Sequence, residues 1–122
     1  MDLNIAIWIL QGLTAFVFMF SGINKTYFDE KTLVRKGQTG VEGLPKWFIK
    51  FIGVSEILGA ITLIVPMVAN RWIVLTSISA ICLGFIMIPA AYIHSKRNEP
   101  KNAIINLIIL IVCGFIAYYR MK

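Results

Sequence analysis

The chain has 122 residues, of which 58% are hydrophobic and only 15% are charged, and its mean hydropathy is +0.78. Soluble domains usually have about 45–50% apolar and about 25% charged residues, so this composition argues against a water-soluble fold and favours a membrane protein. The net charge of +6 is attributed to membrane topology and not to nucleic-acid binding, because no binding module or aromatic-basic platform accompanies it.

The first apolar run covers residues 5–23, long enough to cross about 30 Å of hydrocarbon as a helix. It could be a signal peptide, but residues 1–4 carry no positive charge and no small-residue cleavage motif follows the run. We therefore expect a retained transmembrane helix. Its inward face is predicted from helical spacing: Gln11, Thr14, Phe18, Ser21, Gly22 and Lys25.

The longest gap between apolar runs covers residues 24–44. This segment is polar and glycine-rich, and we expect it to be too short and too polar to bury a core of its own. Two alternatives remain open for it: its apolar residues could lay it on the membrane surface, or a partner could order it. These apolar residues are Tyr27, Phe28, Leu33 and Val34.

The second run, at residues 45–66, begins at Pro45, which suits the first turn of a helix, and is expected to stop at Pro66. Glu56 lies about three turns inside it, where a charged carboxylate costs about 2.5–3.5 kcal/mol. Lys25 ends the first helix on the same side of the membrane, and its long stem can reach inward. We expect Glu56 to contact Lys25, directly or through Asn24 or water; the alternative is a protonated Glu56 that hydrogen-bonds across helices. The residues that share its face are Gly53, Gly59 and Ala60.

The third and fourth runs, at residues 72–93 and 102–119, are separated by Asn98 and Pro100. Their small and polar residues follow helical spacing, and such residues usually face other helices in a membrane. The inward faces are predicted to be Ser77, Ala80, Gly84 and Ala91 in the third helix, and Asn102, Asn106, Cys113, Ala117 and Arg120 in the fourth.

Four further side chains have alternative readings. His94 is expected to be an interfacial residue, because no second His or Cys lies at metal-ligand spacing, and no metal site is predicted. Arg120 could reach lipid phosphates or cap a polar cavity with Gln11. Cys82 and Cys113 are expected to be small hydrophobic residues at a close helix contact, with a disulfide between them as the alternative. No C-x-x-C motif is present, so a thiol-disulfide enzyme of the usual kind is not indicated.

Together these runs predict an all-α membrane protein of a single domain covering residues 1–122. Short loops make sequential helices antiparallel neighbours, so the expected fold is an up-down bundle of four transmembrane helices. The 24–50 and 94–102 loops hold nine Lys and Arg residues, against three on the other side. Because positive residues concentrate in the cytoplasm, we expect both loops there and both termini outside a cell (plasma or inner) membrane.

Three stretches resemble the DoxX-like family of small four-helix membrane proteins: FMFSGINK, GLPKWFIKFIGVSEILGAITLIVP and IINLIILIVCGFIAYYR. The marks of the resemblance are Gly22-x-x-Lys25, the helix with Gly53, Glu56 and Gly59, and Arg120 closing the last helix. The family takes its name from a small subunit of an archaeal terminal quinol oxidase or thiosulfate:quinone oxidoreductase. Its other members resemble partners of membrane redox or thiol-stress complexes.

The resemblance implies a small subunit or partner of a membrane oxidoreductase, linked to a quinone and without an intrinsic cofactor. It also implies a membrane redox complex or a homo-oligomer as the partner, within the lipid bilayer. Whether the chain has an enzymatic activity of its own is left open. The predicted intramembrane polar site comprises Glu56, Lys25, Asn24, Gln11 and Arg120, with Ser21, Asn106 and His94 as further contributors.

Two other functions stay open. The chain could be a non-enzymatic factor that assembles or stabilises another membrane protein by packing its small-residue faces against it. It could also be a small proton-coupled transporter, since small multidrug exporters share its length and helix number. Those exporters carry their essential Glu in the first helix, where this chain has only Gln11, and this counts against transport.

Overall fold

The computed structural model describes residues 3–121 and consists of helices joined by short connections. Four of these helices are long and apolar enough to cross a membrane, which confirms the four predicted runs, with ends shifted by a few residues. Between the first two lie a short helix and a 3₁₀ turn. The elements are α1 (Leu3–Tyr27), α2 (Glu30–Arg35), η1 (Thr39–Val41), α3 (Lys46–Ala69), α4 (Val74–Lys96) and α5 (Pro100–Met121).

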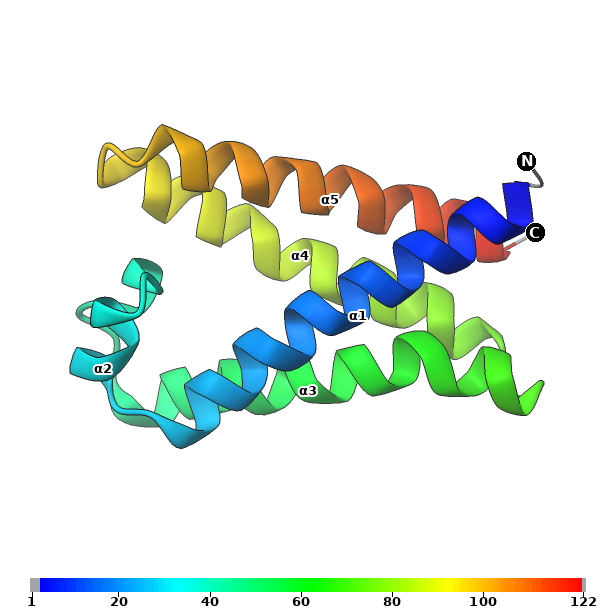
Figure 1. The fold of residues 1–122 in the computed structure, drawn as a ribbon, viewed down its shortest axis with the longest axis horizontal. Coiled ribbons are helices and arrows are strands. Elements are labelled where there is room, and N and C mark those ends of the chain that lie inside the picture. The colour runs from blue at the N-terminus through cyan, green and yellow to red at the C-terminus, as the bar shows by residue number, and fades with distance from the viewer. Residues whose placement is uncertain (1–2, 122) are drawn as a thin grey trace.

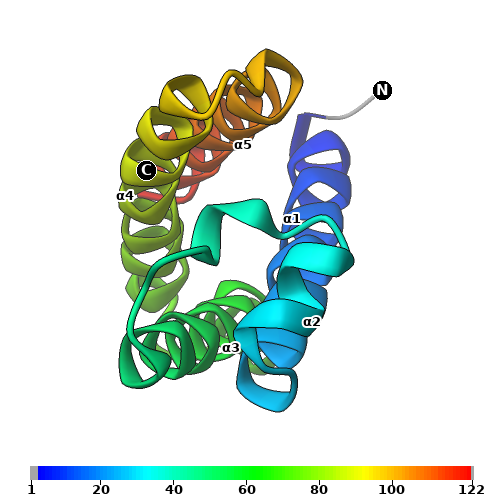
Figure 2. The ribbon, with the colours of Figure 1, turned by 90° about the vertical axis from the view of Figure 1, so that its left-hand side faces the viewer.

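The four long helices form an antiparallel bundle. The start of α1 and the end of α5 lie together at one end, here called the terminal end, and the opposite loop end carries α2, η1 and the turn between α4 and α5 (Figure 1). Helix α1 packs mainly on α3, and α4 packs mainly on α5. Seen from the loop end, the four helices surround a central space that the η1 segment crosses (Figure 2).

The predicted end of the second transmembrane helix at Pro66 is wrong, because α3 continues through this proline to Ala69. Proline lacks an N–H, so the carbonyl of Thr62 loses its usual helical partner. The hydroxyl of Thr76 in α4 donates a hydrogen bond to that carbonyl over 3.4 Å. A neighbouring helix thus replaces the missing bond, and α3 ends instead at Asn70, which has the left-handed conformation of a helix cap (φ 55°).

Most of the residues that were predicted to face inward are buried or partly buried in the bundle. Gly22 and Gly53 bring the backbones of α1 and α3 together, because a Cβ atom at Gly22 would lie 2.6 Å from the Gly53 carbonyl oxygen. Cys113 is buried in the core, but Cys82 is exposed, so its predicted place at a helix contact is wrong; both thiols are free. The largest fully buried apolar side chains are Phe18, Ile7, Leu33, Leu63, Leu83 and Ile116.

The segment between α1 and α3 folds back onto the loop end of the bundle. Asp29 caps α2 by accepting a hydrogen bond from the Thr32 N–H. Leu33 and Val41 are buried against Ile49 of α3 and form a small second core. The segment therefore has no separate core of its own, and its buried side chains share one with α3.

Candidate functional site

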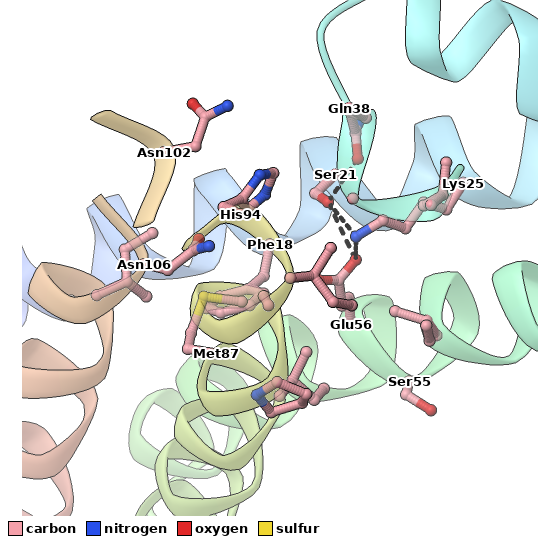
Figure 3. A pocket seen from close by; sticks show the side chains of 18 of the residues that line it. Phe18, Ser21, Lys25, Gln38, Ser55, Glu56, Met87, His94, Asn102 and Asn106 are labelled. Carbon is pink, nitrogen blue, oxygen red and sulfur yellow. Dashed lines mark hydrogen bonds and ion pairs between the residues drawn. The ribbon is translucent and has the colours of Figure 1, made fainter. Parts of the chain in front are cut away.

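The predicted contact between Lys25 and Glu56 is present and direct. Lys25 Nζ lies 3.0 Å from Glu56 Oε1, and the Glu56 side chain is almost completely buried. Ser21 Oγ lies 3.0 Å from the same carboxylate oxygen and 3.1 Å from Lys25 Nζ, so the three groups form a closed hydrogen-bonded triangle (Figure 3). Asn24 is partly buried nearby in α1 but takes no part in this triangle.

Local helix geometry explains why these residues meet. Gly22 and Gly53 allow the close approach of α1 and α3. Because the two helices are antiparallel, Lys25 lies one turn from Gly22 toward the loop end, whereas Glu56 lies one turn from Gly53 toward the terminal end. Side chains on a helix tilt toward its N-terminus, so the long Lys25 stem reaches back toward Ser21 and the Glu56 carboxylate leans toward it. A buried ion pair costs desolvation, and the mutual attraction of the two charges and the Ser21 hydroxyl offset part of that cost.

Lys50 supports the site from the loop end, a role that the sequence analysis missed. Its Nζ donates hydrogen bonds to the carbonyls of Lys25, Thr26 and Phe28 over 3.1, 2.9 and 2.9 Å. The last carbonyls of a helix lack internal partners, and a cation there is favourable. Lys50 precedes Gly53 by one helical turn on α3. This spacing indicates that Lys50 lies on the face of α3 that contacts α1, and it was the sequence signal that could have identified the residue.

A cavity of about 550 Å³ adjoins the triangle at the loop end. Its volume falls within the usual range of about 300–1,000 Å³ for small-molecule sites. Side chains from all four long helices and from residues 37–44 line it, and most of them are apolar. Its polar lining residues are Ser21, Lys25, Gln38, Ser55, Glu56, His94, Asn102 and Asn106.

Residues exposed on the outer surface of the bundle border the cavity on two sides. Val17 of α1 and Ile105 of α5 line it and are themselves 45% and 44% exposed. On another side, Phe51 of α3 and Phe85 of α4 line it and are exposed as well. A molecule dissolved in the hydrocarbon could therefore enter without passing through water.

Residues 38–42, here called the cover segment, close the cavity at the loop end. Two glycines with positive φ flank it, Gly37 (99°) and Gly43 (86°), and Gln38 and Val41 line the cavity. Positive φ values favour glycine, which lets the chain turn sharply on both sides of the cover segment.

The cover segment is tied to the turn between α4 and α5. Thr39 Oγ1 lies 2.9 Å from both carboxylate oxygens of Glu99, and Arg97 donates to Glu42 over 2.6 Å. His94, predicted as an interfacial residue, sits near the end of α4 with Nδ1 2.7 Å from Glu99 Oε1. The hydrogen bonds from His94 and then Thr39 lower the pKa of Glu99 below its ordinary value of 4.5.

Gln11 and Arg120 form a separate cluster at the terminal end. Arg120 Nε donates to Gln11 Oε1 over 2.6 Å, and Gln11 Nε2 donates to the Leu63 carbonyl over 3.0 Å. The Arg120 guanidinium also lies 5.3 Å from the ring centres of Trp8 and Tyr119. Of the two readings for Arg120, the contact with Gln11 is present, but neither residue lines the cavity. The single predicted polar site is thus two sites, one at each end of the bundle.

The part of the chain that the structure describes contains no candidate metal-binding site. Among residues 3–121, no group of three or more His, Cys, Asp or Glu side chains is arranged to hold a metal ion. The nearest approach is His94 with Glu99, which are two groups bonded to each other.

Comparisons with known proteins identify the family but no individual relative. The family model described as the DoxX-like family matches residues 9–116, which is nearly the whole chain. Searches of curated proteins and of solved structures gave no match. With four apolar helices and this match, the chain is an integral membrane protein and belongs to the DoxX-like family.

Proposed function

We propose that this chain is a small subunit or partner of a membrane oxidoreductase and that its cavity binds a quinone. The observation that carries the proposal is the hydrogen-bonded triangle of Ser21, Lys25 and Glu56 at the wall of a cavity that is bordered by residues exposed on the outer surface of the bundle. Family membership is consistent with this role, since the family takes its name from a subunit of a quinone-linked enzyme.

A quinone has a polar head group and an apolar tail, and the cavity is lined by both polar and apolar side chains. Its carbonyl oxygens accept hydrogen bonds, and Lys25 Nζ is a donor at the cavity wall with a third N–H beyond those that it gives to Ser21 and Glu56. Its hydrocarbon tail needs apolar contacts, which side chains such as Phe18 and Ile109 provide. Quinone reduction consumes two electrons and two protons. We assign both electrons to the partner oxidoreductase and both protons to the aqueous phase, with the Glu56 carboxylate as the group that takes up each proton and passes it to the head group.

We also propose that the loop end faces the cytoplasm. Of the described Lys and Arg residues, nine belong to the loop end and two, Arg71 and Arg120, to the terminal end; Lys122 lies outside the described residues. The excess of positive charge on one side is the usual signal for the cytoplasmic side of a membrane protein.

The structure gives less support to the two alternative functions, an assembly factor and a small proton-coupled transporter. Gly22 and Gly53 pack against each other within this chain, so this small-residue face is not free to bind another membrane protein. An exporter of the small multidrug type would place its cavity between two copies. Here side chains of all four long helices from one copy line the cavity.

Photo-labelling tests the proposal. The purified protein in lipid nanodiscs is irradiated with an azido-benzoquinone that carries a decyl chain, and the labelled peptides are mapped by mass spectrometry. We expect labels on cavity-lining residues of α3 and α5, and loss of these labels when unlabelled decyl-benzoquinone competes. Labelling that is spread over the lipid-facing surface and insensitive to competition would count against quinone binding.

Gentle purification tests the partner role separately. We expect subunits of a membrane oxidoreductase to co-purify with the wild-type chain from its native membrane. Recovery of the chain alone, or with a protein that has no redox function, would argue against the oxidoreductase assignment and would favour the assembly role.

A further inference from the structure

The Asn106 side chain is an unexplained polar group in the cavity. It lies on α5, between exposed apolar residues such as Ile105 and Leu107, and it lines the cavity. Its Nδ2 is buried and has no hydrogen-bond partner among the residues that the structure describes. Figure 3 shows Asn106 on the α5 side of the cavity and the Ser21–Lys25–Glu56 triangle on the other side, with His94 between them.

An unpaired buried N–H group is costly, and the residues that the structure describes offer it no acceptor. The amide can reorient easily, because the terminal torsion of Asn is broad and turns its N–H group toward a new acceptor. An acceptor within the cavity would therefore gain a hydrogen bond that none of the described residues supplies.

The charges around the cavity indicate an uncharged ligand. Lys25 and Glu56 neutralise each other, and His94 is bonded to Glu99. Among the described residues, the only Lys, Arg, His, Asp or Glu side chains that line the cavity are Lys25, Glu56 and His94. A ligand with a net charge would have no free counter-charge in an otherwise apolar cavity, where a lone charge is strongly disfavoured.

From these observations we propose that Asn106 is the second head-group contact of the cavity. The ligand is then an uncharged amphiphile with hydrogen-bond acceptors on two sides of its head group: one side faces Lys25 and Ser21, and the other faces Asn106. A 1,4-dicarbonyl ring has this pattern, whereas a fatty acid carries a charge and a fatty alcohol has a single polar end. This inference rests on the proposed function and assigns the specificity of that site to a named residue.

The test replaces Asn106 by Leu, which has the same branching and the same number of side-chain heavy atoms and removes the unpaired polar group. Asn24→Leu is the matched control, because it makes the same exchange at a partly buried position that does not line the cavity. Binding of decyl-1,4-benzoquinone is measured by equilibrium competition in nanodiscs, beside a decyl-cyclohexadienone that has only one carbonyl.

We expect Asn106→Leu to weaken quinone binding about tenfold and to remove the preference for the quinone over the one-carbonyl probe. The control should stay within about twofold of wild type. The melting temperature of ligand-free Asn106→Leu should equal or exceed that of wild type, because an unpaired buried polar group has been removed.

Three results would overturn the inference. Equal quinone affinity in wild type and Asn106→Leu refutes the role of Asn106 while the proposed function stands. Equal losses in both variants, or a lower melting temperature of ligand-free Asn106→Leu, indicate a structural role. Absence of saturable quinone binding to the wild type rejects the proposed function and the inference together.

Discussion

The Lys25–Glu56 pair shows what single residues reveal in a membrane sequence. Charged side chains are rare in apolar helices, so each one stands out, and the long stem of Lys25 at the end of its helix predicts a contact with the carboxylate of Glu56. The partners of Lys50 could not be predicted in the same way. They are backbone carbonyls at the end of α1, and their position depends on where that helix stops.

A double-mutant cycle measures the coupling of this pair. Lys25→Met leaves the Glu56 carboxylate buried without its cation and should lower the free energy of unfolding by about 3 kcal/mol. Glu56→Gln keeps an acceptor for Ser21 and Lys25, so it should cost less and leave the fold intact while any proton-linked activity is lost. The double variant should be more stable than Lys25→Met alone, as measured by reversible unfolding in mixed micelles. Strictly additive losses would show that the pair is not coupled.

At the scale of the element, hydropathy predicts which segments span the membrane but not where each helix ends. The end at Pro66 was mispredicted because the compensating hydrogen bond comes from Thr76 in another helix. The cover segment was likewise unpredictable: its ties to Glu99 and Arg97 join residues about 60 positions apart in the chain. Such contacts arise from tertiary packing and leave no local pattern.

Gly22→Ala tests the close contact of α1 and α3. The added Cβ would lie 2.6 Å from the Gly53 carbonyl oxygen, so the helices must separate and the protein should lose about 1–3 kcal/mol of stability. Gly12→Ala is the control on the same helix, since open space surrounds Gly12; it should be neutral or stabilising. Thermal unfolding of both variants provides the comparison, and equal melting temperatures would contradict the close contact.

The ties of the cover segment should depend on pH through Glu99. Its pKa is lowered in the folded protein, so the stabilisation is present at neutral pH and is lost as the pH falls through that lowered pKa, below 4.5. Hydrogen exchange at the Glu42 and Leu44 amides, corrected for its intrinsic pH dependence, should stay slow above pH 4.5 and quicken below it. Glu99→Gln should quicken it at neutral pH, whereas Lys101→Gln, on the exposed start of α5, should not. Unchanged exchange in Glu99→Gln would show that Glu99 does not hold the cover segment.

At the scale of the whole molecule, the sequence predicts the bundle but merges its two polar sites. Gln11 and Lys25 share one face of α1, yet fourteen residues separate them, which is about 21 Å along a helix. A helical face therefore groups residues that the three-dimensional structure places at opposite ends. The cavity also emerges only at this scale, since it needs all four long helices and the cover segment.

The orientation of the bundle follows from its charge and can be measured directly. Lys31 is exposed on α2 at the loop end, and Arg71 is exposed between α3 and α4 at the terminal end. In a background in which both native cysteines are replaced by Ala, Lys31→Cys should react with a membrane-impermeant maleimide only after the cells are permeabilised. Arg71→Cys should react in intact cells if the loop end faces the cytoplasm, as we propose from its nine Lys and Arg residues. The reverse pattern would place the cover segment outside, and equal labelling of both sites in intact cells would indicate dual orientation, in which half of the cavities open toward each side.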